Sequence, residues 1–165
     1  MTTPQPRIAV VDDDPFVASH LTETILARLP GAEVVGVTNP VAPVGFDVYI
    51  VDKEFGDADR GFELVRRVKA IAPDSLVIAY SAFLDKEFLR NLLSEACDAA
   101  FDKGSLEQLD EMMGLIVEFL DPSRVAAKAP RGLKDTLSSI TDLVREWNVR
   151  LAANGRAAPE YHRDG

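Results

Sequence analysis

Short runs of apolar residues recur along the first three quarters of the chain, with polar segments between them. Each run is continuous and only a few residues long, as expected of strands that are buried on both faces of a parallel sheet. The pattern therefore predicts five strands, over residues 8–11, 33–37, 48–51, 76–80 and 99–101.

Segments with helical periodicity separate most of these strands. Asp14 followed by Pro15 favours the start of a helix, because aspartate caps a helix N-terminus and proline fits its first position. Ser105, with Gln108 three residues later, has the pattern of a capping box. Helices are therefore predicted to start near residues 15, 61, 85 and 106. The buried face of the helix near residue 61 should hold Phe62, Leu64, Val65, Val68 and Ile71.

Strands that alternate with helices favour a parallel sheet with helices on both faces. The predicted fold class is α/β, with a doubly wound five-stranded parallel sheet. One link departs from regular alternation, because residues 38–47, between the second and third strands, contain two prolines and one glycine. A full crossover helix fits these ten residues poorly, so we expect a shortened helix of a turn or two at most, or none.

The composition indicates a soluble protein of a reducing compartment. The apolar fraction of 47% is ample for one packed core, and 165 residues suit one domain with an extension. Cys97 is the only cysteine, so no disulfide can form within the chain. No apolar run approaches about 18 residues and no signal-peptide pattern opens the sequence, so we expect a cytoplasmic protein without membrane insertion.

The negative charge is concentrated in residues 1–120, which hold 10 Lys and Arg against 21 Asp and Glu. Residues 121–165 hold 8 against 6 and are slightly basic. A domain this acidic cannot bind a phosphate backbone through a basic face, so we expect no direct contact with nucleic acid.

Polar and charged residues follow four of the five predicted strands. Asp12 and Asp13 follow the first, Asp52 the third, Ser81 the fourth and Lys103 the fifth. The carboxyl ends of parallel strands meet at one edge of a sheet, where ligands bind. Three carboxylates that meet there repel one another, and a hard divalent cation relieves the repulsion. Mg²⁺ is the ordinary choice, and Lys103 is a second source of positive charge.

These residues belong to the motifs VVDD at 10–13, IVD at 50–52, YSA at 80–82 and FDK at 101–103. With these motifs in order, residues 7–120 resemble the receiver domain of two-component response regulators. The resemblance implies a flavodoxin-like strand order, 2-1-3-4-5. It also implies a signalling protein and no enzyme activity beyond self-catalysed phosphoryl transfer and autodephosphorylation.

The resemblance assigns a role to each acidic residue. Asp52 would accept a phosphoryl group from a histidine on a partner, either a histidine kinase or a phosphotransfer protein. Asp13 and Asp52 would hold Mg²⁺ together with the backbone carbonyl of Glu54, and Asp12 would contribute through water.

The same resemblance implies that Ser81 and Lys103 bind the phosphoryl oxygens, which fits a reaction that depends on positioning and charge neutralisation. The second helix is short or absent, and the loop after Asp52 is one residue longer than usual to the glycine, with Gly56 where the family commonly has proline. Two further positions depart from the family pattern. Ala100 stands where the family usually has an aromatic side chain that reports activation, and Gly104 stands where it usually has proline. The usual aromatic relay cannot operate through alanine, and Phe101 should point to the other face of its strand.

Two alternatives follow from the same residues. A receiver-like interaction module that no longer uses phosphorylation is compatible with these departures. Asp12 and Asp14 also have the spacing of the paired aspartates in haloacid dehalogenase-like hydrolases, in which the first is the nucleophile and the second an acid and base. The acidic residues after Lys103 fall within a predicted helix, which does not suit that family.

The end of the chain carries a separate pattern. We predict a receiver domain over 1–122, a linker over 123–132, an amphipathic helix over 133–152 and a disordered tail over 153–165. Apolar residues recur in the helix at alternating spacings of four and three, namely Leu133, Leu137, Ile140, Val144, Trp147 and Leu151. This heptad seam must be buried on its own receiver, on a second copy in a homodimer, or on a partner protein. We expect output through such protein contacts.

Overall fold

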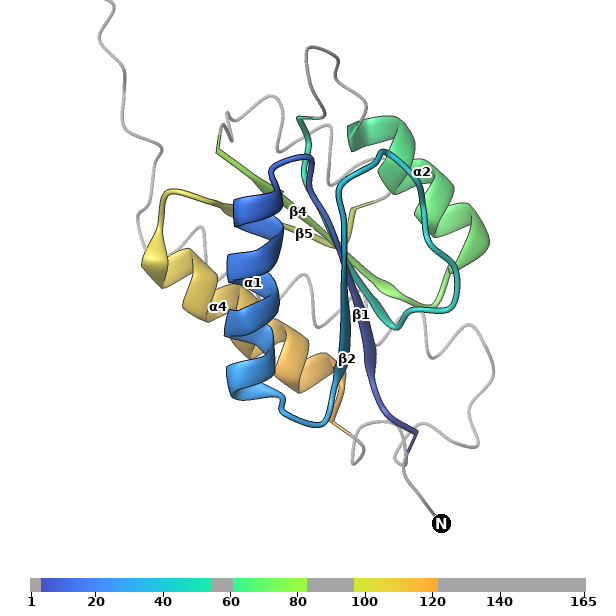
Figure 1. Cartoon of the computed structure of the whole chain (residues 1–165). Helices are drawn as coiled ribbons and strands as arrows, with labels where there is room; N and C mark the ends of the chain where they lie inside the picture. Colours follow the sequence, from blue (N-terminus) through green and yellow to red (C-terminus); the bar gives the residue numbers. More distant parts are fainter. Residues whose placement is uncertain (1–3, 55–60, 83–96, 122–165) are drawn as a thin grey trace, which may run out of the picture.

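The computed structural model describes residues 4–54, 61–82 and 97–121. At its centre is a five-stranded parallel sheet in the order β2-β1-β3-β4-β5 (Figure 1). The strands are β1 (Arg7–Val11), β2 (Glu33–Val37), β3 (Val48–Val51), β4 (Leu76–Ser81) and β5 (Ala99–Asp102). All five predicted strands are present, so the predicted fold class and strand order are confirmed.

Helices cover both faces of the sheet. The helices α1 (Pro15–Arg28) and α4 (Leu106–Phe119) pack on one face, and α2 (Gly61–Ile71) packs on the other (Figure 1). Each face has its own apolar core, and Phe101 belongs to the core under α1 and α4. Ala100 belongs to the opposite core, under α2, as the alternation of side chains along a strand predicts.

The two capped helices begin where their sequence signals predict. The Asp14 side chain accepts a hydrogen bond of 2.9 Å from the N–H of Phe16, and Ser105 Oγ accepts one of 3.2 Å from the N–H of Gln108. Only half of the predicted capping box forms at Ser105. The side chain of Gln108 accepts a hydrogen bond from the N–H of Asp102 instead.

Residues 38–47 form no helix, which confirms the expectation for this link. Arg7, at the start of β1, connects residues 38–47 to the sheet. Its Nη1 donates a hydrogen bond of 2.7 Å to the carbonyl of Gly45, and its guanidinium lies 4.6 Å from the centre of the Phe46 ring. Gly45 has a φ of 84°, a conformation that favours glycine.

Two predictions of burial are wrong. β2 is only partly buried, because it lies at the sheet edge and no helix follows it. Ile71 is 49% exposed at the end of α2. The buried stripe of that helix passes through Leu64, Val65 and Val68 and continues to Ala72, so Ile71 falls beside it.

Several predictions concern residues that the structure does not describe, and they stay predictions. They are the helix near residue 85, the linker over 123–132, the helix over 133–152, the tail over 153–165 and the buried side chain of Phe62. Among the helices that are described, none has the length and apolar character needed to span a membrane.

Candidate functional site

Strand register places two aspartates side by side. Val11 of β1 is paired with Val51 of β3, so Asp12 and Asp52 are the next residues on two neighbouring strands. The N–H of Asp52 donates a hydrogen bond of 2.8 Å to the carbonyl of Val11, which fixes the backbone at this point. Both residues are buried, with exposed fractions of 2% for Asp12 and 5% for Asp52.

The next pair of strands brings in Ser81 and Lys103. Ser81 of β4 is paired with Asp102 of β5, and the N–H of Lys103 donates a hydrogen bond of 3.0 Å to the Ser81 carbonyl. Ser81 is completely buried. Ser81 and Lys103 therefore lie at the ends of neighbouring strands, at the same edge of the sheet as the aspartates.

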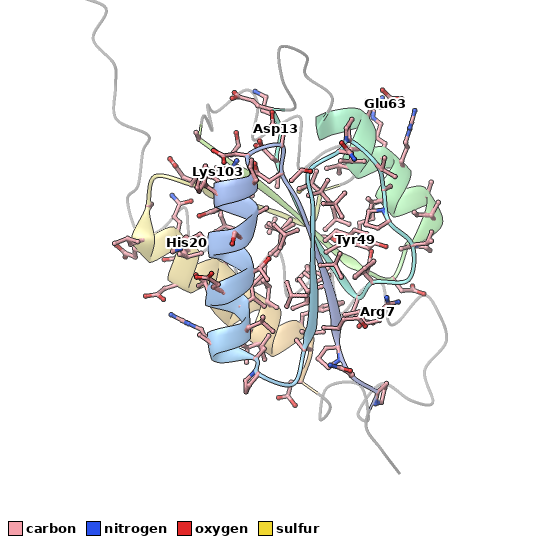
Figure 2. The ribbon with its side chains drawn as sticks, in the orientation of Figure 1. Arg7, Asp13, His20, Tyr49, Glu63 and Lys103 are labelled. Carbon is pink, nitrogen blue, oxygen red and sulfur yellow. The ribbon has the colours of Figure 1, made fainter. Side chains whose placement is uncertain are left out.

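Three carboxylates converge at this edge. One oxygen each from Asp12, Asp13 and Asp52 lies within 4.8 Å of the other two. Asp13 is exposed, and Figure 2 places it at the same end of the sheet as Lys103. In the part of the chain that the structure describes, no other group of three acidic, histidine or cysteine side chains meets in this way.

Lys103 lies between two of these carboxylates. Its Nζ is 2.6 Å from Asp12 Oδ2 and 3.1 Å from Asp52 Oδ1. Burial acts to lower the pKa of Lys103, but hydrogen bonds and charge interactions with the two aspartates outweigh it and raise the pKa above its ordinary value. The amine is therefore charged at neutral pH and compensates part of the negative charge.

Asp52 is the carboxylate that the site perturbs most clearly. Burial raises its pKa to about 6, and the negative charge of Asp12 acts in the same direction. Lys103 and the backbone N–H of Glu54, which donates to the carboxylate, oppose the rise. At pH 7 Asp52 is mostly ionised, but in surroundings that disfavour its charge. A cation bound beside Asp52 would offset the free-energy cost of holding its negative charge in buried surroundings.

Asp14 takes no part in the acidic cluster. Its side chain caps α1, and its N–H donates a hydrogen bond of 3.0 Å to Asp12 Oδ1. A haloacid dehalogenase-like mechanism needs a second free carboxylate at this position. The structure therefore removes the main support for the hydrolase alternative.

Gly61, at the start of α2, supports the site in a way that its sequence position alone did not reveal. Its N–H donates a hydrogen bond of 3.0 Å to the carbonyl of Lys53. A Cβ at Gly61 would lie 2.4 Å from the Lys53 carbonyl oxygen and 2.6 Å from that of Asp52. A glycine that opens a helix soon after an acidic strand end is the signal that could have indicated this close approach.

Tyr80 is a second neighbour that was not anticipated. Tyr80 is 6% exposed, and the centre of its ring lies 6.0 Å from Lys103 Nζ, at the outer limit of a cation–π contact. The only sequence signal for a contact between Tyr80 and Lys103 is the position of Tyr80 directly before Ser81.

No family model and no curated protein matches the sequence. Solved structures do match it. The BeF3-activated receiver domain of DrrB superposes with a TM-score of 0.60 at 22% identity, over 71% of this chain and 98% of that domain. The chain has the receiver-domain fold. It spans 54% of a longer DrrB structure, an OmpR/PhoB homologue from Thermotoga maritima.

Two further receiver structures give the same result. The receiver domain of a DNA-binding response regulator from Colwellia psychrerythraea 34H has a TM-score of 0.61 and 23% identity, over 69% of this chain and 99% of that one. A CheY-like receiver protein from Methanospirillum hungatei JF-1 has a TM-score of 0.52 and 20% identity, over 89% and 99%. At these identities the likeness shows the fold alone.

Proposed function

We propose that the chain is the phosphoacceptor receiver of a two-component or phosphorelay system, with Asp52 as the acceptor. One observation carries the proposal: Asp12, Asp13 and Asp52 converge within 4.8 Å at the ends of parallel strands, and Lys103 lies between two of them. The receiver-domain fold supports it, since this strand edge is the ligand-binding edge of doubly wound sheets.

The reaction requires an ionised acceptor and positive charge around it. An oxygen of Asp52 would form the bond to phosphorus while the bond from phosphorus to the imidazole nitrogen of the donor breaks. The donor imidazole, already protonated on its other ring nitrogen, would then leave as a neutral ring, so no further proton is needed. Lys103 would turn toward the phosphoryl oxygens from its position against Asp52. The hydroxyl of Ser81, on the neighbouring strand, would donate a hydrogen bond to another of them.

The donor atoms at this edge fit Mg²⁺, because carboxylate oxygens are the ligands that hard divalent cations prefer. Asp13 and Asp52 would bind the ion directly with the backbone carbonyl of Glu54, and Asp12 would act through water. The ion would supply the charge neutralisation that lets an anionic acceptor meet an anionic phosphoryl group. The exposed position of Asp13 leaves the cluster open on one side.

The partners follow from this chemistry. A histidine kinase or phosphotransfer protein of the cytoplasm would supply the phosphoryl group. Output would occur through protein contacts, with residues 133–152 as an association helix that can form a homodimer, and without direct binding to nucleic acid. A second candidate function is an interaction module that works without phosphorylation. It is favoured by Ala100, which packs in the core under α2 at the position where receiver domains usually have an aromatic side chain that reports activation.

Incubation with acetyl phosphate and Mg²⁺, followed by intact-mass measurement, tests the proposal. The wild-type chain should gain one phosphoryl group, and chelation of Mg²⁺ should abolish the gain. Asp52→Asn should gain none, whereas the matched control Asp14→Asn, which changes the capping residue at the same edge, should react like the wild type. Phosphorylation of Asp52→Asn would place the acceptor elsewhere, and an unreactive wild type would favour the phosphorylation-independent module.

A further inference from the structure

Side chains hold the turn that carries Lys103. Asp102 Oδ1 accepts a hydrogen bond of 2.6 Å from the N–H of Gly104, and Gln108 Oε1 accepts one of 2.8 Å from the N–H of Asp102. The N–H of Lys103 itself donates to the carbonyl of Ser81. The backbone is therefore fixed immediately before, at and after the lysine.

This fixation matters because a lysine side chain has a long and flexible stem. The two contacts of Lys103 Nζ, 2.6 Å to Asp12 and 3.1 Å to Asp52, depend on where the stem begins. Glycine at position 104 has wide freedom in φ and ψ, and the hydrogen bond from its N–H to Asp102 Oδ1 restrains the peptide between Lys103 and Gly104. The side-chain hydrogen bonds of Asp102 and Gln108 therefore restrain a turn that its glycine would otherwise leave flexible.

Gln108 connects this turn to a helix. It lies in the first turn of α4, and its own N–H donates to Ser105 Oγ, which caps the helix. Its side-chain carbonyl reaches back past the cap to the N–H of Asp102, the last residue of β5. One side chain thus joins the start of α4 to the strand end from which Lys103 projects.

We infer that Gln108 is a positioning residue for Lys103. Its side-chain carbonyl fixes the end of β5, so that the ammonium group stands between Asp12 and Asp52. The inference rests on the proposed function of Asp52, because the position of Lys103 is measured through phosphorylation. Gln108 is not a member of the acidic cluster, and it is hydrogen-bonded to Asp102 and Ser105, so its effect would pass through the backbone of the turn.

The test is the rate of phosphorylation by acetyl phosphate at saturating Mg²⁺ in the full chain. Gln108→Leu removes the acceptor and should slow the reaction about ten-fold, since small displacements of a catalytic group are costly in rate. Gln108→Glu keeps an acceptor of the same length and should restore the rate. Gln108→Asn shortens the side chain and should be slow, which covers the case in which the leucine variant fails to fold.

Ser105→Ala is the matched control, because it removes the cap of α4 and leaves the side chain of Gln108 in place. It should lower the melting temperature and leave the phosphorylation rate unchanged. If Gln108→Leu or Gln108→Asn reacts as fast as the wild type, or if Ser105→Ala is equally slow, Gln108 serves only the stability of the helix and the inference is overturned. A wild-type chain that takes no phosphoryl group overturns the proposed function, and this inference with it.

Discussion

At the scale of single residues, Asp52 combines the features that an acceptor needs with features that disfavour the folded state. Asp52 is 5% exposed, its carboxylate lies near Asp12 and contacts Lys103, and burial is the main cause of its raised pKa. A buried carboxylate beside a like charge is more stable when a proton or a cation neutralises it. The raised pKa of Asp52 should therefore be measurable as a dependence of the free energy of unfolding on pH.

We predict that the destabilising contribution of Asp52 to the metal-free protein disappears as the pH falls from 7 toward 4. The pKa of Asp52 is about 6 in the folded chain against an ordinary 3.8, so between these values the folded state binds more protons than the unfolded state. The full contribution to the free energy of unfolding is at most about 3 kcal/mol.

Urea unfolding of the wild type and of Asp52→Asn, both with a chelator, isolates this contribution. The variant should be the more stable at pH 7, and the difference should shrink by pH 4. A difference in stability that does not change with pH would show that the pKa of Asp52 is not raised in the folded chain.

At the scale of elements, the strands, the two helix caps and the missing helix could be predicted because their signals are local. A continuous apolar run, Asp14 before Pro15, and prolines in a short link each act on their own neighbourhood. The exposure of Ile71 and the contact between Gln108 and Asp102 could not be predicted, because they depend on which elements pack together. The convergence of Asp12, Asp52 and Lys103 at one edge was predictable because each follows a strand. The approach of Gly61 to the backbone of Lys53 was not, because it occurs across space.

We predict that Gly61→Ala disturbs the junction between β3 and α2. Its Cβ would lie 2.4 Å from the Cα and the carbonyl oxygen of Lys53, so backbone must move. We expect a loss of about 1–3 kcal/mol in the free energy of unfolding, as for other overpacked sites, and slower phosphorylation of Asp52.

Gly31→Ala is the matched control, because a Cβ at Gly31 meets no atom within 4 Å. Chemical denaturation and the acetyl phosphate assay should both distinguish the two variants. Equal stability of the two would mean that α2 and the backbone after Asp52 are not in close contact.

At the scale of the whole molecule, an acidic domain is followed by a slightly basic segment. The matched receiver domain of DrrB is covered almost completely, at 98%, by 71% of this chain. The heptad seam predicted from the sequence, between Leu133 and Leu151, lies outside the described residues. Burial of each large side chain in such a seam would contribute about 1.5–3 kcal/mol before entropy is counted, which would favour association of two chains.

We predict that the C-terminal helix serves association and is not needed for the receiver to fold. In sedimentation experiments the full chain should be dimeric, and a chain that ends at Pro122 should be folded and monomeric. Leu137→Glu and Val144→Glu should dissociate the full chain. A full chain that is monomeric throughout, beside a truncated chain of reduced thermal stability, would indicate that the helix packs on its own receiver.

The most direct test of the central claim is to locate the phosphoryl group by chemistry specific to an acyl phosphate. The chain is phosphorylated with acetyl phosphate and Mg²⁺ and reduced with borohydride, which converts a phosphorylated aspartate into homoserine, and its peptides are then sequenced by mass spectrometry. The account predicts homoserine at position 52, only in the sample that received both the phosphodonor and Mg²⁺. Homoserine at another aspartate, or none at position 52 in a sample that had gained a phosphoryl group, would contradict it.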